Sequence, residues 1–463
     1  MKTLALIFVA FCCIGICAYT VPDPDIQLLS PRGIRVSIPD ATGIQLVAFN
    51  GNVNKNIIPD QSGSISREIF RPTSSKWMFE DTHTLVQRRD VLHYWIYIQV
   101  DGSPHKKTGS WSPSATSPSG SCTPSITTTT RQGLICQGQL ILEDNFDSLN
   151  TSIWSRDIFI PSQPQYEFCV YHNHQQSVRI KNGTLHVIPS LLEDSYGERA
   201  TAVGTMTLAE CTSQVPSDCS RSATGYLILP PVISARLTTI NHFNFQYGRV
   251  EIRAKFPEGD WLYPELWLQP KNPTQFSEFQ SVFVQLGMAR GNRVLTGTTG
   301  NYDGRLLEFG LRAGSAPNFQ SVDIQKFSNT TGHWTSGFHV YSTTWNADGF
   351  VFHVDGEEAG RLTPRQNDWF SNSNASSGTR NKMSPFDGQF YITLGVGVGG
   401  VRDFPDNLRS GDGVGYEKPW KNVAAKALLR FWEAKNYWLP SWQDSNNPGK
   451  SHLQIDYVRV YAL

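Results

Sequence analysis

The sequence predicts an all-β protein that contains a small β-sandwich followed by a larger one. Many short runs alternate apolar and polar residues, which is the pattern of strands packed on one face, and Gly, Pro and Asn separate these runs. Aromatic residues make up 12% of the chain, a value typical of β cores and also of sugar-binding surfaces. A chain of 463 residues has room for two or three domains.

The overall charge excludes partners that are recognised by a strong electrostatic field. Lys+Arg and Asp+Glu both total 40, and charged residues make up only 17% of the chain. A neutral chain of this kind lacks the basic surface that binds nucleic acid or an anionic membrane. The sequence contains no Cys/His spacing of a zinc site, and we interpret His172 and His174 as a solvated strand face. We therefore expect no metal and no cofactor.

The first 18 residues predict a cleaved signal peptide. Lys2 precedes an apolar run from Leu4 to Cys17, and small residues lie near the predicted cleavage site. This run is shorter than the roughly 20 residues of a membrane span, and no later run is long enough. The mature protein is therefore predicted to be secreted and to have no membrane span. Four sequons are candidate glycan sites, beginning at Asn150, Asn182, Asn329 and Asn374.

Removal of the signal peptide leaves five cysteines. An odd number in a secreted chain implies either a leftover thiol or an intermolecular bridge. Cys211 and Cys219 flank a short polar loop that contains proline, and they are our first candidate disulfide. Cys122 with Cys136 is the second candidate.

Residues 19–107 are predicted to form the small sandwich. Alternating runs mark its strands, and residues 51–54 are predicted to be a turn; the runs are residues 33–40, 44–49, 77–79 and 94–100. Residues 108–135 are rich in Ser, Thr, Pro and Gly and are predicted to be a flexible linker. Residues 136–463 would then form the larger sandwich. Its first and last strands are predicted at residues 138–147 and 452–461, and residues 247–256 alternate as a further strand. Residues 350–356 are predicted to end in an Asp-Gly hairpin turn.

The first block resembles the amino-terminal glucan-binding domain of the insect β-1,3-glucan recognition proteins, also called Gram-negative-bacteria binding proteins. The resemblance is carried by Pro31-Arg-Gly-Ile-Arg-Val-Ser-Ile-Pro-Asp40, Phe49-Asn-Gly-Asn52 and Tyr94-Trp-Ile-Tyr97, with Trp77 between the last two. It implies an immunoglobulin-like sandwich that binds glucan through Arg35, Asp40 and Trp77. The alternation leaves open whether the Trp77 ring faces sugar or lies in the core.

The second block contains five runs in a specific order, residues 227–236, 247–256, 261–270, 350–356 and 395–400. Through them it resembles the glycoside hydrolase family 16 domain of the same proteins, which implies a concanavalin-like jelly roll. Arg236, Trp261 and Trp267 match positions that line the family's cleft, so a vestigial groove is expected. Core packing is the alternative for both tryptophans, and we favour it for Trp267.

The stretch Ser281-Val-Phe-Val-Gln-Leu-Gly-Met-Ala-Arg-Gly-Asn292 resembles the active-site strand of that family. The family pattern Glu-x-Asp-x-x-Glu, with a bulge before its last residue, aligns with Phe283, Gln285 and Met288. Retaining hydrolysis needs two carboxyl groups about 5 Å apart, and Phe and Met have none. Glu278, the only acid between Lys271 and Gly300, is a poor substitute because its odd spacing from Phe283 points it to the other face.

These observations predict a secreted, non-enzymatic recognition protein that binds the β-1,3-glucan of microbial walls. By resemblance, it would signal to a serine protease cascade of the prophenoloxidase or Toll type and would self-associate on its ligand. One alternative is an active secreted β-1,3-glucanase with an accessory binding domain, and the missing carboxylates count against it. Another is a structural or storage glycoprotein, which the binding-domain pattern disfavours.

Overall fold

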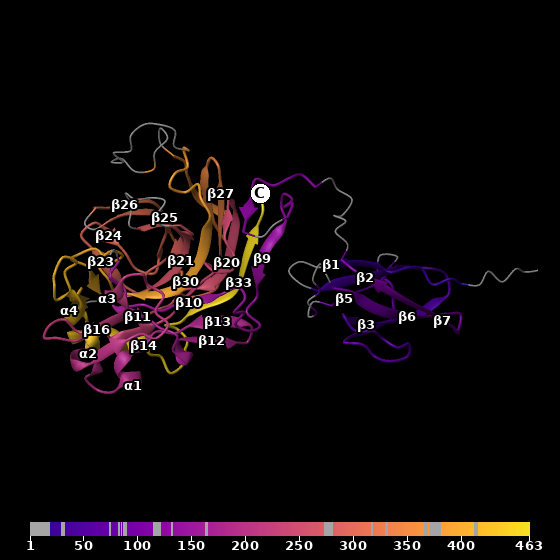
Figure 1. Cartoon of the computed structure of the whole chain (residues 1–463), viewed down its shortest axis with the longest axis horizontal. Helices are drawn as coiled ribbons and strands as arrows, with labels where there is room; N and C mark the ends of the chain where they lie inside the picture. Colours follow the sequence, from indigo (N-terminus) through magenta and orange to yellow (C-terminus); the bar gives the residue numbers. More distant parts are fainter. Residues whose placement is uncertain are drawn as a thin grey trace, which may run out of the picture. The chain divides into compact units, whose positions relative to one another are not determined.

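A computed structural model describes residues 19–463 apart from residues 29–32, 74–75, 82–83, 85, 87–89, 114–121, 131–132, 163–164, 273–280, 316–317, 329–331, 365–368, 370–380 and 412–414. The predicted signal peptide, Glu278 and the sequons at Asn329 and Asn374 fall outside the described residues. The chain divides into two compact units, Met1–Cys122 and Thr123–Leu463 (Figure 1). None of the helices described is long and apolar enough to cross a membrane.

The small unit contains a three-stranded and a four-stranded antiparallel sheet, in the orders β1-β2-β5 and β4-β3-β6-β7. One apolar cluster draws side chains from both sheets, among them Val36, Phe49, Trp77 and Ile96. It forms because alternate residues of each strand point inward. The strands are β1 (Asp25–Leu28), β2 (Ile34–Pro39), β3 (Ile44–Val53), β4 (Ile65–Ile69), β5 (Lys76–Asp81), β6 (Leu92–Val100) and β7 (Ser103–Trp111).

Two expectations for this region are wrong in detail. The predicted linker starts too early, because Thr108 lies inside β7 and pairs with Trp95 of β6. Thr is a good strand former, and pairing with a long neighbouring strand outweighs its polar composition. The predicted turn at residues 51–54 is mostly strand, since β3 continues to Val53, and the left-handed turn residue is Asn54.

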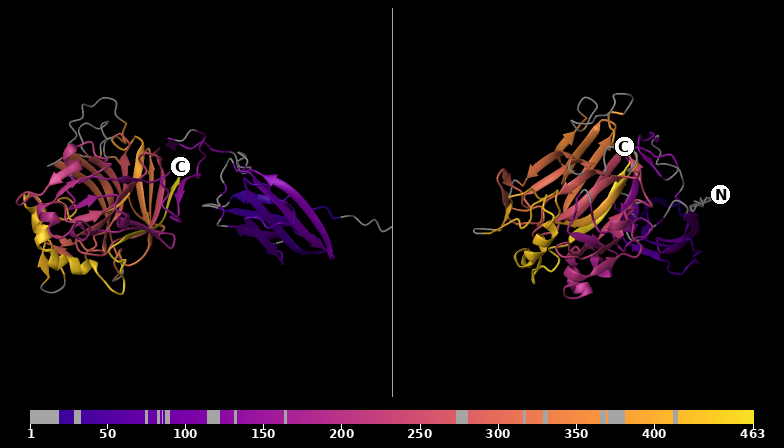
Figure 2. Two further views of the ribbon diagram at one scale, coloured as in Figure 1. Left: turned by 60° about the horizontal axis from the view of Figure 1, so that its bottom comes forward. Right: turned by 60° about the vertical axis from the view of Figure 1, so that its left-hand side comes forward.

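The large unit is built on two large sheets, seen as curved layers in Figure 2. One has the order β10-β18-β30-β21-β22-β25-β26, with β19 and β8 attached, and the other has the order β12-β13-β33-β20-β27-β28-β29, with β9 attached. The strands of the first are β8 (Thr128–Thr129), β10 (Ser155–Asp157), β18 (Arg236–Thr238), β19 (Phe245–Gln246), β21 (Leu262–Pro270), β22 (Ser281–Met288), β25 (Leu306–Ser315), β26 (Asn318–Phe327) and β30 (Phe390–Val398). Those of the second are β9 (Leu140–Asp144), β12 (Val178–Lys181), β13 (Thr184–Val187), β20 (Gly248–Lys255), β27 (His339–Asn346), β28 (Gly349–Val354), β29 (Glu357–Leu362) and β33 (Leu453–Tyr461).

The predicted terminal strands of this unit lie side by side, since β9 pairs with β33. The predicted Asp-Gly hairpin is also present: Asp355 and Gly356 have φ values of 53° and 83° and connect β28 to β29. Side chains of both large sheets join one apolar cluster, including Ile252, Leu268 and Val458. The sequence prediction of a larger sandwich is confirmed.

Short elements gather at one end of the large unit, where Figure 1 labels α1 to α4. The helices are α1 (Leu192–Tyr196), α2 (Ala200–Val203), α3 (Pro216–Cys219), α4 (Ala427–Glu433) and α5 (Lys435–Trp438), with 3-10 turns η1 (Gln175–Ser177) and η3 (Leu439–Trp442). The remaining strands are β11 (Cys169–Tyr171), β14 (Ser190–Leu191), β15 (Thr205–Thr207), β16 (Ser220–Ser222), β17 (Val232–Ser234), β23 (Leu295–Gly297), β24 (Gly300–Asn301), β31 (Arg409–Ser410) and β32 (Tyr416–Glu417).

Candidate functional site

One face of the nine-stranded sheet collects most of the cleft residues that the sequence singled out. Alternation along β21 sends Leu266 and Leu268 into the apolar cluster and leaves Glu265 and Trp267 on the opposite face. The same alternation on β18 buries Leu237 in the cluster and leaves Arg236 on the other side. This face carries the candidate site of the large unit.

The active-site-like strand β22 has the expected bulge but no acid at the three aligned positions. Its pairing with β25 shifts register between Gln285 and Met288. Phe283 packs on Trp267 with 4.5 Å between ring centroids, and the Gln285 side-chain amide donates to the Glu308 carbonyl at 3.3 Å. Met288 is 1% exposed and belongs to the apolar cluster. These side chains are packed as parts of the sheet.

A buried ion-pair network occupies the centre of this face. The Arg236 guanidinium donates to Glu265 at 2.6 and 2.8 Å and to Glu167 at 2.9 Å. The Tyr171 hydroxyl donates to Glu265 at 2.6 Å, and the Tyr171 ring lies 3.9 Å from the guanidinium carbon. Removal of one partner would leave an uncompensated buried charge, so the network should be maintained as a unit.

Burial changes the acidity of two carboxyl groups near Arg236. It raises the pKa of Glu167 to about 7, because the stabilising charge of Arg236 does not offset the loss of water and the repulsion by Glu265. Burial also raises the pKa of Asp157 to about 6 against the opposing effect of Arg236. Both groups therefore keep their protons to a higher pH than free carboxyl groups do.

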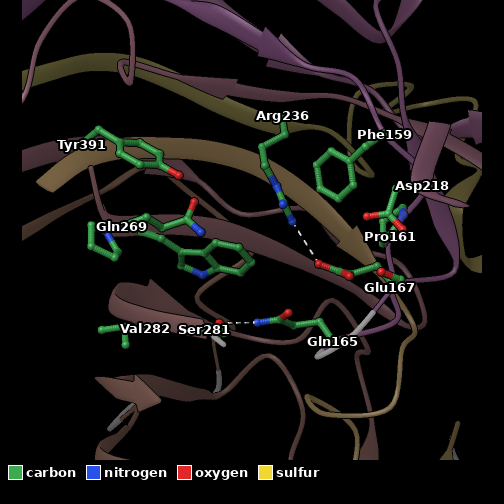
Figure 3. Close-up of a pocket in the computed structure, with 13 residues that line it drawn as sticks. Phe159, Pro161, Gln165, Glu167, Asp218, Arg236, Gln269, Ser281, Val282 and Tyr391 are labelled. Carbon is green, nitrogen blue, oxygen red and sulfur yellow. Dashed lines mark hydrogen bonds and ion pairs between the residues drawn. The ribbon is translucent and has the colours of Figure 1, made fainter. Parts of the chain in front are cut away.

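A cavity of about 240 Å³ opens beside the network and is drawn in Figure 3. Tyr391 and Gln269 project into it from one side, and Phe159, Glu167 and Asp218 from the other. Its lining residues are Phe159, Pro161, Ser162, Gln165, Glu167, Asp218, Arg236, Trp267, Gln269, Pro270, Ser281, Val282 and Tyr391. Arg236, which we expected to line a groove, is among the residues of this cavity.

The structure reverses the positions that we expected for Trp261 in the cleft and Trp267 in the core. Trp261 is fully buried and packs against Trp420 with 5.0 Å between ring centroids, so it does not line the cavity. Its indole donates to the Tyr416 hydroxyl at 2.9 Å. Trp267, which we expected in the core, lines the cavity instead. Trp261 precedes β21 with a positive φ of 66°, and this break in the alternation explains the error.

Two of the acids near the cavity, Glu265 and Glu167, are engaged in ion pairs. Glu265 is fully buried, and Arg236 holds both it and Glu167. A nucleophile must reach the sugar carbon, and a carboxylate fixed beneath a guanidinium does not. Glu308 lies on β25 opposite Met288 but is bound by Arg290 at 2.7 Å.

In the small unit, the structure corrects the expected role of Trp77. The side chain is 2% exposed and belongs to the apolar cluster, so its ring does not face solvent. Its indole nitrogen donates to the Asp40 carboxylate at 2.7 Å, and Asp40 itself is exposed. Arg35 points outward from β2 and forms an ion pair with Glu80 at 2.7 Å. Arg35 and Asp40 are therefore accessible, whereas Trp77 supports Asp40 from inside.

The disulfide predicted between Cys211 and Cys219 is present. Cys122 and Cys136 are also disulfide-bonded, and the odd cysteine is Cys169, which is free and buried. The sequon residues Asn150 and Asn182 are both exposed. Within the described ranges, no three His, Cys, Asp or Glu side chains are placed to hold a metal ion.

Sequence reasoning missed Glu265, Glu167 and Asp218. Glu265 carried a usable signal, because it is a charged residue inside the apolar run Leu262–Pro270. A charge in such a strand is expected to be paired, and Arg236 lies in another apolar run. Glu167 and Asp218 lie outside regular strands, where no periodic pattern indicates the direction of a side chain.

Comparisons with known proteins agree with the two-unit organisation. A family model described as a carbohydrate binding domain (family 32) matches residues 20–124. The chain is 31% identical to a β-1,3-glucan-binding protein 1 of Galleria mellonella, with 100% of both chains covered. It is 32% identical to Gram-negative bacteria-binding protein 1 of Drosophila melanogaster, with 99% of this chain and 98% of that protein covered.

Two solved glucanase structures are similar to part of this chain. The laminarinase catalytic domain of Thermotoga maritima is 20% identical, with a TM-score of 0.42, and the match covers 70% of this chain and 98% of that one. The endo-β-1,3-glucanase of Pyrococcus furiosus is 19% identical, with a TM-score of 0.43, and the match covers 70% and 94%. Similarity at this level does not assign an activity.

Proposed function

The chain belongs to the family of β-1,3-glucan-binding and Gram-negative bacteria-binding proteins, and on that premise we propose that it recognises β-1,3-glucan of microbial cell walls. The region similar to a carbohydrate binding domain, residues 20–124, spans the strands of the small unit. We place the principal glucan site there, on the outer face of the β1-β2-β5 sheet. The observation that carries this proposal is the row of exposed polar side chains on that face.

The outer face follows from the alternation of its three strands. Ile26, Val36 and Trp77 point into the core, so their neighbours point outward. Two rows result, with Gln27, Arg35 and Glu80 side by side in one and Asp25, Ser37 and Met78 in the other. We call five of these residues, all except the apolar Met78, the polar face.

Hydrogen bonds connect the groups of the polar face. Arg35 and Glu80 form an ion pair whose side chains are each 42% exposed. The Gln27 amide donates to Asp25 at 2.9 Å, and Ser37, which is largely covered by its neighbours, lies 3.5 Å from the same carboxylate. The exposed groups are therefore held in place while still reachable by a ligand.

Such a face suits a neutral polysaccharide. Sugar hydroxyls both donate and accept, and bonds to charged groups are stronger than those between neutral groups. Strands lie about 4.8 Å apart, so the face offers donors and acceptors at regular steps. One apolar contact contributes only about 25 cal/mol per Å² buried, and tight binding therefore needs several contacts along an ordered polymer. Asp40, at the end of β2, extends the proposed site.

The large unit is proposed to lack hydrolytic activity. Phe283, Gln285 and Met288 occupy the aligned positions of the family's carboxylates, and all three are buried. Glu167 and Glu265 are both bound by Arg236 in the buried ion-pair network. The relatives' names, which describe binding, support the same interpretation.

The biological setting forms a further part of the proposal. The signal-like residues 1–18 support secretion, with a mature chain that begins near Tyr19 and carries glycan at one or more sequons. Family membership supports signalling to a serine protease cascade of the prophenoloxidase or Toll type. Several proteins on one polymer would also be brought close together, which favours self-association because later contacts become effectively intramolecular.

A sedimentation assay tests the recognition proposal. The full-length secreted protein is mixed with insoluble curdlan, cellulose or peptidoglycan, and the pellet is assayed for protein. We expect strong retention on curdlan, a β-1,3-glucan, and little on the other two polymers. Equal retention on all three would show adhesion without recognition, and retention on peptidoglycan alone would refute the assigned ligand.

A further inference from the structure

A second cavity of the large unit is lined by a different set of residues from the one beside Arg236. Its volume is about 540 Å³, and its lining residues all lie outside the strands. The loop between β20 and β21 contributes Glu258, and the loop after β22 contributes Arg293. Arg305, just before β25, and Lys450, just before β33, complete the charged part of the wall that concerns us. We call this space the charged cavity.

The Lys450 ammonium is largely buried, and no acceptor among the described residues lies within hydrogen-bond distance of it. Its side chain is 14% exposed, and the Glu258 carboxylate that pairs with it is 3.6 Å away. Glu258 is itself only 18% exposed, and the Arg293 guanidinium lies 4.0 Å from it. A largely buried charge without a close partner is costly, so an incoming anion that accepts from Lys450 would be stabilised.

Two arginines extend the cationic side of the charged cavity. Arg293 is 73% exposed, and its contact with Glu258 is too long for a hydrogen bond, so a ligand carboxylate can recruit its guanidinium. Arg305 is fixed, because its Nε and Nη2 donate to Asp303 at 3.0 and 2.6 Å. Its Nη1 has no hydrogen-bond partner among the described residues. A guanidinium held in this way keeps donors in a defined orientation for a second acid.

The backbone around the charged cavity favours a carboxylate over a phosphate. Phosphate sites commonly use open backbone N–H groups of glycine loops or helix ends. Here the amides of Gly259, Gly291 and Gly411 each donate to a carbonyl, at 2.9, 2.8 and 3.1 Å. The cations that remain are side chains, and Glu258 beside them repels a dianion more strongly than it repels a single carboxylate.

The size and rigidity of the charged cavity suit a segment of polypeptide. A volume of about 540 Å³ exceeds what one carboxylate fills and lies within the range of about 300–1,000 Å³ that is typical of ligand pockets. Clusters of arginine are a recurring means of recognising acidic motifs. A Cβ on Gly291 would lie 2.5 Å from the Gly259 carbonyl, so these two loops touch and the wall is preorganised for a ligand.

We infer that the charged cavity docks an acidic segment of another polypeptide, with a Glu or Asp carboxylate of that segment accepting from Lys450, Arg293 and Arg305. Glu258 competes with the incoming carboxylate for the same cations and therefore sets the affinity. This inference goes beyond the proposed function, because it gives the large unit a protein partner. It is independent of glucan binding by the small unit.

Fluorescence anisotropy of the full-length protein tests the inference, with a fluorescein-labelled peptide of alternating Glu and Gly and a neutral peptide of alternating Gln and Gly. We expect binding of the acidic peptide only, and added salt should weaken it. Arg293→Gln should weaken binding severalfold, and Lys450→Met, which keeps an apolar stem but removes the charge, by about tenfold or more. Arg361→Gln, which changes an exposed arginine paired with Glu358 outside the cavity, is the matched control and should change nothing.

Glu258→Gln gives a readout that a merely structural role would not give. Removal of the competing carboxylate should tighten binding of the acidic peptide severalfold, because Lys450 and Arg293 then have no other acid to share. Unchanged or weaker binding in Glu258→Gln would overturn the inference.

The other outcomes are equally decisive. Equal binding of the two peptides, or unchanged binding in both Arg293→Gln and Lys450→Met, would overturn the site. Displacement of the acidic peptide by inorganic phosphate at a lower concentration than by acetate would assign the cavity to phosphate and also overturn it. If Lys450→Met lowers the melting temperature, Arg293→Gln and Glu258→Gln decide. Curdlan sedimentation separates the two proposals, since failure of the parent to sediment would refute glucan recognition alone and leave the peptide result standing.

Discussion

Arg236 and Glu265 form their ion pair across an intervening strand. They lie on β18 and β21, which flank β30, and both are in register with Gly395 of that strand. The guanidinium and carboxylate are 2.6 Å apart at their closest atoms. Because Gly395 has no side chain, the two residues meet above it: a Cβ at this position would lie 2.4 Å from the Glu265 carboxylate.

Gly395→Ala should therefore destabilise the large unit. The added methyl must push Glu265 away from Arg236, and breaking a buried ion pair costs about 3–5 kcal/mol. Urea unfolding followed by tryptophan fluorescence measures the change in the free energy of unfolding. Gly337→Ala is the matched control, because its Cβ would meet no atom within 4 Å, and it should change stability by less than about 0.5 kcal/mol. Equal stability of both variants would contradict the proposed packing.

Stability should depend on pH through Glu167. Its pKa is raised from 4.5 to about 7, so between these values the folded protein binds more protons than the unfolded chain. The contribution of Glu167 is therefore fully present below about pH 4.5 and is lost as the pH rises through about 7. Glu167→Gln should flatten the fall in unfolding free energy between pH 5 and 8, whereas the exposed control Glu198→Gln should reproduce the slope of the parent. A slope that is unchanged in Glu167→Gln would contradict the assignment.

Trp77→Ala should destabilise the small unit. The ring is buried in the core and anchors Asp40, and truncation of a buried tryptophan costs about 3–5 kcal/mol. Met78→Ala, the next residue in β5, removes an outward side chain and should have a much smaller effect. Calorimetry on the full-length variants resolves the transition of this unit. Unchanged stability of the Trp77→Ala protein would contradict the core position of Trp77 and indicate that its ring lies at the surface.

The sequence was most informative where a pattern repeats. Alternation identified β2, β6, β20, β22 and β33, and it placed Phe283 and Gln285 on one face of their strand. It could not tell which face of β5 is inside, because Trp77 suits either a core or a sugar platform. Only the pairing of β5 with β2, packed on a second sheet, makes that face interior.

Features that depend on contacts between distant strands could not be predicted from the sequence. Arg236 and Glu265 are 29 residues apart in the sequence, and they meet because β30, from much later in the chain, lies between their strands. Asp218 lies in a short helical turn whose partners are set by a disulfide and by loop contacts, which leave no periodic signal.

The protein should release no reducing ends from laminarin above a blank. Even Phe283→Glu, Gln285→Asp and Met288→Glu combined should remain inactive, because Met288 lies in the apolar cluster and Phe283 packs on Trp267. Carboxyl groups placed there would be buried without partners, and the supporting residues of an active site would be lacking. A reducing-sugar assay on chromatographically pure protein measures this. Turnover by the parent would refute the proposed absence of activity.

The most direct test of glucan recognition by the polar face is curdlan sedimentation of full-length Arg35→Ala. Arg35 is the central donor of that face, and loss of a charge-assisted bond should weaken binding by roughly tenfold or more. Tyr97→Ala, on β6 of the four-stranded sheet, is the matched control and should sediment like the parent. If Arg35→Ala is retained like the parent and Tyr97→Ala is lost from the pellet, the glucan site lies on the other sheet. That result would contradict the account.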